Sequence, residues 1–150
     1  KNAGAHGVVF GILTTEYTVS LFNKELVSFS KEYGLEVTFH RAFDFVSDYN
    51  AAIKTLIEFG FDRLLTSGLQ ETAIEGIDVI QELQQKHGDL IQIMAGSGVN
   101  QNNALKLAST GINNLHFTAH KSLGGSTNLS MGELMVVDEV KIKSIISQFK

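Results

Sequence analysis

Short apolar runs with strand-like composition recur along the chain, and each one follows a glycine after a short interval. These runs are rich in β-branched and aromatic residues, and most are apolar on both faces. Such runs are typical of strands in a parallel sheet that is covered by helices. The predicted strands span residues 8–13, 35–40, 62–67, 90–96 and 114–119.

Segments with helical spacing of apolar residues fill the intervals between these runs. They predict helices over 21–33, 51–59, 74–87 and 103–109, and a final helix over about 138–149 after a loop. The residues expected to share one face of each helix are Leu21, Leu26 and Phe29; Ile53, Leu56 and Ile57; Ile74, Ile77, Ile80 and Leu83; and Leu105 and Ala108. The expected N-caps are Ser20, Ser47, Thr72 and Asn100, and the expected left-handed residues after helices are Gly34, Gly60, Gly88 and Gly111.

This alternation predicts an α/β protein in which a strand–helix unit repeats five times. The opening residues, 1–4, resemble the tail of a helix that has lost its beginning. Residues 1–150 are therefore interpreted as one domain that forms the back part of a longer repeat. Five such units cannot close an eight-stranded barrel alone.

Composition narrows the classes of function. The net charge is −4 and no basic patch stands out, which disfavours nucleic acid as a partner. No apolar run reaches the roughly 18 residues of a membrane helix and no signal pattern is present, so a cytoplasmic protein that does not bind membranes is expected. The chain has no Cys, which excludes disulfides, thiolate zinc sites and Cys nucleophiles within it.

The loops after the predicted strands form the candidate site, because ligands of parallel α/β folds bind at the C-terminal strand ends. These loops, 14–20, 40–47, 66–72, 96–101 and 118–125, are polar. Strand alternation groups polar side chains on one face, which we expect to line the lumen. They are Thr38 and His40, Gln92 and Met94, and Asn114, His116 and Thr118.

The loop at 96–101 has features of an anion site. Small residues such as Gly96, Ser97 and Gly98 let a ligand approach the backbone, and a helix near Asn100 would offer unpaired N–H groups. The following segment, 121–126, supplies one cation, Lys121. The alternative is a tight turn that needs glycine for its shape alone. The chain carries neither a P-loop motif nor GxGxxG.

His40, Arg41 and Asp44 are candidates for catalysis. His40 and Asp44 could act as a base and its orienting group, and Arg41 could grip a carboxylate or phosphate. Arg41 could equally pair with Asp44 and fix the loop.

A second possibility is a Cu(I) site made of His40, Met94 and His116, because Cu(I) accepts soft thioether ligands and imidazole ligands. Asp62 and Arg63, at the start of the third predicted strand, are interpreted as surface charges.

The segments VTFHRAFD (37–44), LLTSG (64–68) and IMAGSGV (93–99) together resemble the CutC copper homeostasis family, and the resemblance covers essentially the whole chain. It implies a TIM (β/α)8 barrel, of which this chain matches strands four to eight. It also implies a cytosolic protein linked to copper tolerance or trafficking, with a copper ion or a small molecule as partner.

By position, the residues that match family motifs are His40, Arg41 and Asp44 for HRAFD; Thr66, Ser67 and Gly68 for TSG; and Ala95, Gly96 and Gly98 for the glycine turn. We count Thr66, Ser67 and Gly68 among the ligand-binding candidates. The alternative function is a TIM-barrel enzyme that acts on a small phosphorylated metabolite. We also expect a homo-oligomer.

Overall fold

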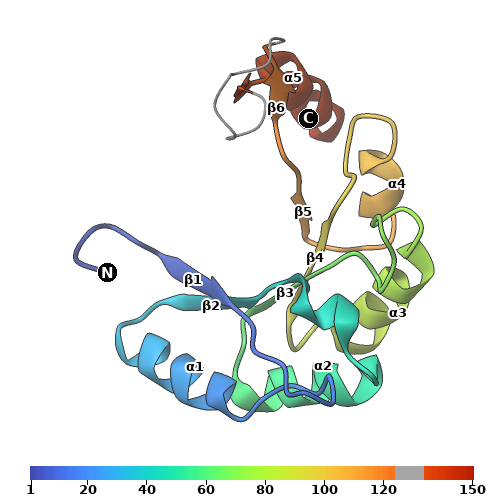
Figure 1. The fold of residues 1–150 in the computed structure, drawn as a ribbon. Helices are drawn as coiled ribbons and strands as arrows, with labels where there is room; N and C mark the ends of the chain where they lie inside the picture. The colour runs from blue at the N-terminus through green and yellow to red at the C-terminus, as the bar shows by residue number, and fades with distance from the viewer. Residues whose placement is uncertain (124–133) are drawn as a thin grey trace.

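The computed structural model describes residues 1–123 and 134–150. Its centre is a five-stranded parallel sheet in which the spatial order of the strands equals their order in the chain (Figure 1). The strands are β1 (Gly7–Phe10), β2 (Glu36–Phe39), β3 (Arg63–Thr66), β4 (Gln92–Gly96) and β5 (Asn114–His116). Strands β2 to β5 lie within predicted runs, and β1 overlaps the run predicted over 8–13 but begins one residue earlier, so the prediction of a parallel α/β sheet is confirmed.

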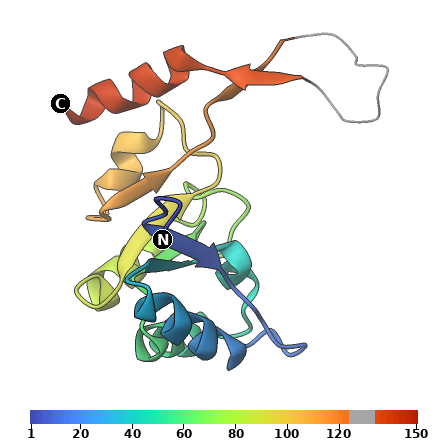
Figure 2. The ribbon, with the colours of Figure 1, turned by 90° about the vertical axis from the view of Figure 1, so that its left-hand side faces the viewer.

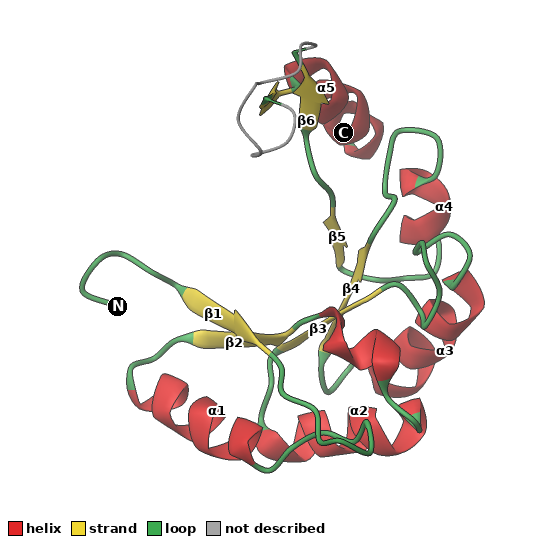
Figure 3. Cartoon of the chain, viewed as in Figure 1, coloured by secondary structure: helices red, strands yellow, loops and turns green. Residues whose placement is uncertain are grey.

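Helices cover one face of this sheet and leave the other face open (Figures 1 and 3). They are α1 (Phe22–Glu32), α2 (Tyr49–Phe59), α3 (Ile77–His87) and α4 (Ala104–Ala108). A short 3-10 helix, η1 (Arg41–Phe45), follows β2 directly. The sheet curves around its open face in the manner of a barrel wall, which agrees with the expected incomplete TIM barrel.

Beyond β5 the chain forms a feature that the sequence pattern did not predict. Strands β6 (His120–Ser122) and β7 (Met135–Val137) pair as an antiparallel ladder (Figure 2). The helices α5 (Glu139–Ile146) and η2 (Ser147–Phe149) follow and confirm the final helix predicted over about 138–149. Lys121 lies on β6, opposite Val136. The other glycine-rich positions of the predicted loop, 124–126, lie outside the described residues.

The core lies between the sheet and its helices. Val37, Phe39, Leu64 and Ile93 are fully buried, and their strand neighbours Thr38 and Met94 face the open side, as the alternation predicted. The helices contribute Ile53, Leu56, Ile80 and Leu83 to the core, also as predicted. Burial of these side chains supplies the main favourable term of folding, at about 25 cal/mol per Å² of apolar surface.

Helix α1 does not bury the face that apolar spacing singled out. Leu21 and Phe29 are 74% and 59% exposed, whereas Asn23, Val27 and Ser30 face the sheet. The reason is a polar anchor: the Asn23 amide accepts a hydrogen bond from the Ile12 N–H (3.0 Å) and donates to the Ile12 carbonyl (2.8 Å). A buried Asn makes the inward face of a helix look polar. In α4, similarly, Leu105 is 53% exposed and Leu107 is buried.

Several predicted helix ends were also wrong in detail. Asp48, not Ser47, caps α2, because its carboxylate accepts from the Asn50 and Ala51 N–H groups at 2.9 and 3.1 Å. Gly34, Gly60 and Gly111 have the expected positive φ, but Gly88 has φ −60° and continues the helical conformation.

The starts of the remaining predicted helices differ as well. Helix α3 begins at Ile77 rather than at 74, and the expected caps Ser20, Thr72 and Asn100 lie before the N-cap positions of α1, α3 and α4. Thr72 does bond with Glu75, through its hydroxyl at 2.6 Å and its N–H at 3.0 Å, but in the turn that precedes α3.

Candidate functional site

The C-terminal ends of β1 to β5 form the rim of the open face, and the loops there hold unusual backbone conformations. Tyr17, Leu69 and Ser97 are the non-glycine residues with positive φ among those the structure describes, at 58°, 65° and 86°. They lie in the loops after β1, β3 and β4. Left-handed conformations of such residues cost free energy and cluster at functional sites, so the rim is the candidate functional site.

Asp44 is the common acceptor of one rim cluster. Its carboxylate accepts hydrogen bonds from the Arg41 Nε (2.7 Å) and from the Thr66 hydroxyl (2.5 Å). It also accepts from the Ser67 N–H (3.0 and 3.1 Å to its two oxygens), the Ser67 hydroxyl (3.0 Å) and the Leu69 N–H (3.2 Å). The side chain of Asp44 is only 4% exposed. All these donors belong to the protein, so the cluster satisfies itself.

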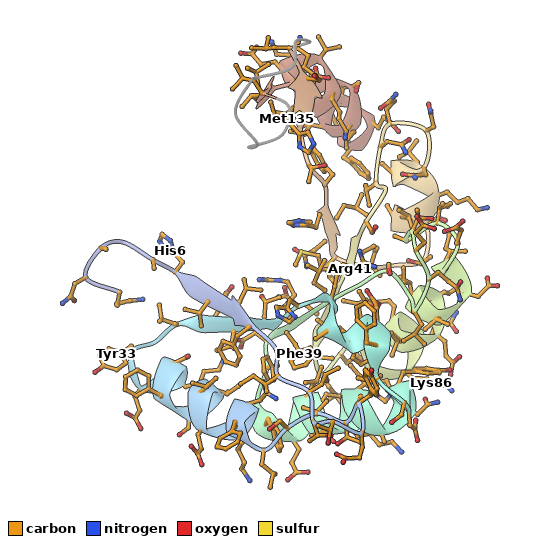
Figure 4. The ribbon with its side chains drawn as sticks, viewed as in Figure 1. His6, Tyr33, Phe39, Arg41, Lys86 and Met135 are labelled. Atoms are coloured by element: carbon orange, nitrogen blue, oxygen red, sulfur yellow. The ribbon has the colours of Figure 1, made fainter. Side chains whose placement is uncertain are left out.

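Arg41 extends the same cluster. Its Nη2 donates to the Ser67 hydroxyl at 2.8 Å, so the guanidinium joins the loop after β2 to the loop after β3. Figure 4 shows Arg41 where η1 meets the strands, away from Lys86 in the outer helical layer. This arrangement supports the second of the two readings of Arg41, in which it fixes the loop.

Gly68 is required for the same loop to pack. A Cβ atom on Gly68 would lie 2.1 Å from the Gly76 carbonyl oxygen. The backbone of the TSG segment therefore lies directly against the turn before α3. Thr66, Ser67 and Gly68 are all buried, which places them behind the rim surface rather than on it.

His40 faces the rim in a defined tautomer. It occupies the N-cap position of η1, where its Nδ1 accepts a hydrogen bond from the Ala42 N–H at 3.1 Å. A backbone N–H can only donate, so a neutral His40 carries its proton on Nε2. A Cβ on Gly11 would lie 2.8 Å from this Nδ1, so the glycine makes room for the ring. His40 thus presents an N–H donor, and no hydrogen bond joins it to Asp44 in the described part of the chain.

A cavity of about 260 Å³ lies at the rim between β4, β5 and α5. Its wall consists of the loop after β4, the end of β5 and one side chain of α5. The lining residues are Ser97, Gly98, Val99, Asn100, His116, Phe117, Thr118 and Lys141. Gly96 is buried directly beneath this loop, at the end of β4.

The cation at this cavity is not the one that the sequence indicated. Lys121 is exposed on β6 and does not line the cavity, whereas Lys141 of α5 does. Sequence reasoning missed Lys141 because it lies in a helix that follows the repeat and is more than 20 positions from any other lining residue. Its spacing gives no local signal.

The metal candidates occupy separate strands. His40 follows β2, Met94 lies in β4 and His116 ends β5. Strand order places His40 and His116 three strand spacings apart, about 14 Å along the sheet. Among residues 1–123 and 134–150, no group of three or more His, Cys, Asp and Glu side chains could hold a metal ion together.

At the opposite end of the strands, Arg63 crosses the open face and is partly exposed. Its guanidinium donates to the Gln92 side-chain oxygen from Nε (3.0 Å) and Nη2 (2.9 Å), and it forms an ion pair with Glu36 at 3.3 Å. Asp62 accepts from the Val37 N–H at 2.6 Å and pairs with Lys31. Both side chains remain partly exposed, at 33% for Asp62 and 21% for Arg63, and their contacts with neighbouring elements are a feature that the sequence did not indicate.

Comparison with known proteins gives a consistent result. A family model described as the CutC family matches residues 1–121. A family protein CutC of Bacteroides thetaiotaomicron is 42% identical over 146 residues, covering 93% of this chain and 58% of the relative. A family protein CutC of Histophilus somni is 43% identical over 148 residues, covering 95% and 60%. The chain therefore spans about six-tenths of the length of these relatives.

Solved structures agree with this match. The crystal structure of a CutC protein from Streptococcus agalactiae, whose proposed role is copper homeostasis, aligns with a TM-score of 0.67 and 31% identity, over 77% of this chain and 57% of that one. A "Native KDPGal structure" aligns with a TM-score of 0.64 over 99% of this chain and 60% of that one. Its identity is 15%, so it supports the fold alone. None of the described helices is long and apolar enough to cross a membrane.

Proposed function

The chain belongs to the CutC family, and on that premise we propose that the whole protein serves copper homeostasis in the cytosol by binding and passing on Cu(I). The family match over residues 1–121 carries this proposal. The similar protein from Streptococcus agalactiae bears the same association with copper homeostasis in its name.

Met94 and His116 are the best-placed ligands for Cu(I) at the rim. In the ladder of β4 and β5, Met94 pairs with Asn114 and Gly96 pairs with His116, so both side chains face the open side on adjacent strands. Their Cα atoms are then about 8 Å apart, from a strand spacing of about 4.8 Å and a rise of about 3.3 Å per residue. Long side chains reach across such a diagonal. Thioether and imidazole groups both suit Cu(I).

His40 fits this proposal less well than the other two candidates. The lone pair of its Nδ1 is engaged by Ala42, and its Nε2 carries the proton. A metal on Nε2 would require the other tautomer and would break the hydrogen bond to Ala42. We therefore assign Cu(I) to Met94 and His116 and leave His40 outside the coordination sphere.

The test is a titration with Cu(I) in competition with a chromophoric chelator. The protein is expected to withdraw copper from the chelator, and Met94→Leu and His116→Gln are each expected to weaken this competition. Met135→Leu and His120→Gln, which alter the same residue types on β6 and β7, serve as matched controls. Absence of competition by the unmodified protein at micromolar concentration would rule the proposal out.

A second candidate function is an enzyme or binding protein for a small phosphorylated metabolite. The specific observation in its favour is the cavity beside Gly98, which Lys141, His116 and Thr118 line with groups that can donate hydrogen bonds. His40, at the end of β2, carries an N–H donor on Nε2 but does not line this cavity. A thermal-shift screen of inorganic phosphate and phosphorylated metabolites tests it. If none of them raises the melting temperature, the second candidate is abandoned.

A further inference from the structure

We infer that the anion of the second candidate function bridges the loop after β4 and helix α5, so that its binding holds α5 against the sheet. The inference rests on that proposed function and goes further, because it names the residue that grips the anion and the element whose position the anion controls. The juxtaposition that carries it is Lys141 of α5 beside Gly98 and Thr118 in one cavity.

Two lysines of α5 differ in their surroundings. Lys143 is exposed and pairs with Glu139 one turn away, at 3.2 Å. Lys141, two positions earlier, is half-buried at the cavity, and its ammonium group forms no ion pair with any residue that the structure describes. A partly desolvated ammonium group without a counter-charge attracts an anion more strongly than a solvated ammonium group that already has an ion-pair partner.

The lining of the cavity selects for negative charge. The Thr118 hydroxyl, the His116 imidazole and the Lys141 ammonium can all donate hydrogen bonds. No Asp or Glu is among the lining residues. At about 260 Å³ the cavity is slightly smaller than the roughly 300 Å³ at which drug-sized ligand pockets begin. A phosphate group with a short substituent matches this charge and size.

The loop half of the cavity is rigid. The Gly98 carbonyl accepts hydrogen bonds from the side-chain amides of Asn100 and Asn103, both at 2.9 Å. The Ser97 hydroxyl donates to the Glu71 carbonyl at 2.8 Å, which ties this loop to the one after β3. The loop is thus organised by bonds within the protein before any ligand arrives.

Helix α5, which forms the other half of the cavity wall, is held against the rest of the protein much more weakly. Ile145 is the one buried residue of α5, whereas Val140 and Ile146 are 73% and 49% exposed. A second cavity of about 370 Å³ lies at this junction, and its lining includes Ile145 and Phe149 together with Ile112 and Leu115. One hydrogen bond, from Gln148 Nε2 to the Gln101 carbonyl (2.9 Å), links η2 to the loop before α4.

Few buried apolar contacts mark an element that opens at low free energy. An anion that contacts both the rigid loop and Lys141 binds only when α5 is docked. By linkage, its binding must then stabilise the docked position of α5.

The experiment combines calorimetric titration with inorganic phosphate and hydrogen–deuterium exchange of α5. Phosphate is expected to bind and to slow amide exchange in residues 139–146. Lys141→Gln is expected to weaken binding by about tenfold or more, as for the loss of one charge-assisted hydrogen bond, and to abolish the protection of α5. Lys143→Gln is the matched control and should behave like the unmodified protein.

Thr118→Val is a second variant that alters the cavity from the β5 side and leaves α5 untouched, and it should also reduce both effects. Phosphate binding without protection of α5, or binding that Lys141→Gln leaves intact, would overturn this inference while the second candidate function survives. Absence of phosphate binding by the unmodified protein would overturn this inference, whereas the second candidate function is abandoned only if the thermal-shift screen of phosphorylated metabolites fails as well.

Discussion

The Thr66 hydroxyl donates a hydrogen bond of 2.5 Å to the Asp44 carboxylate and so joins the end of β3 to the loop after β2. Arg41 closes the same connection from the other side, with Nε on Asp44 at 2.7 Å and Nη2 on the Ser67 hydroxyl at 2.8 Å. A carboxylate that receives so many donors from its own chain has little capacity left for a substrate. The contacts of Asp44 and Arg41 therefore favour a role in fixing the shape of the rim.

Asp44→Asn is expected to lower the free energy of unfolding by about 2–3 kcal/mol, because it removes the ionised acceptor of several buried donors, while the partly exposed Arg41 guanidinium keeps some of its hydration. Urea unfolding measures the difference. Asp48→Asn is the matched control, since Asn caps a helix about as well as Asp does. A loss below about 1 kcal/mol for Asp44→Asn would show that the cluster is dispensable.

His40→Ala is expected to cost about 1 kcal/mol of stability, the usual effect of removing a side-chain cap. His40→Asn should restore most of it, because Asn also accepts a hydrogen bond from a backbone N–H. Thermal and urea unfolding of the two variants provide the comparison. A loss of several kcal/mol in His40→Ala would instead identify the ring as part of a buried polar network.

The exposed apolar stripe of α1, formed by Phe22, Leu26, Phe29 and Tyr33, predicts self-association through a second copy of the chain. The double variant Phe22→Gln/Phe29→Gln should reduce the sedimentation coefficient at high protein concentration. Its stability should change little, by about 0.5 kcal/mol, since both side chains are mostly exposed.

Leu105→Gln alters an isolated exposed residue of α4 and is the control for this stripe. Sedimentation of the double variant that is indistinguishable from that of the unmodified protein would exclude α1 as the contact surface.

The lowered pKa of His87 predicts that the free energy of unfolding falls in mild acid. This pKa is lowered first by burial of the ring and then by the charges of Lys54 and Lys86. In the unfolded chain the pKa of His87 is about 6.5. Between about pH 7 and the lower pKa of the folded state, the unfolded chain therefore binds more protons than the folded chain does. The contribution of His87 to stability is therefore complete above about pH 7 and is lost as the pH falls through this window.

Melting temperatures of the unmodified protein and of His87→Gln between pH 7.5 and 5 test this effect. The variant should lose less stability over the range, and His6→Gln, which changes an exposed His, should not differ from the unmodified protein. An equal pH dependence in all three proteins would contradict the assignment.

The sequence predicted the sheet well because each strand is a short apolar run and each unit repeats the same order of elements. It failed for the inward face of α1, where the buried Asn23 anchors the chain through polar contacts that hydrophobic spacing does not detect. It also missed the hairpin of β6 and β7, because strands of three residues are too short to show alternation.

The candidate site was predictable as a rim but not as a set of contacts. The spacing of Arg41 and Asp44 was compatible with a ligand site and with an ion pair that fixes the loop. The contacts that favour the ion pair come from Thr66 and Ser67, which lie more than 20 positions away. Lys141 became a candidate only when the fold brought α5 to the end of β5. Such long-range pairings leave no periodic signal in one sequence.

The central claim, that ligands bind at the rim where β4 and β5 end, is tested most directly by mapping backbone amide chemical shifts during titration with Cu(I) and with inorganic phosphate. The largest changes are predicted for residues 96–100 and 116–118, with Lys141 following in the phosphate titration. Changes that are absent from these residues with both ligands, or that concentrate on the outer surfaces of α1 to α3, would contradict it.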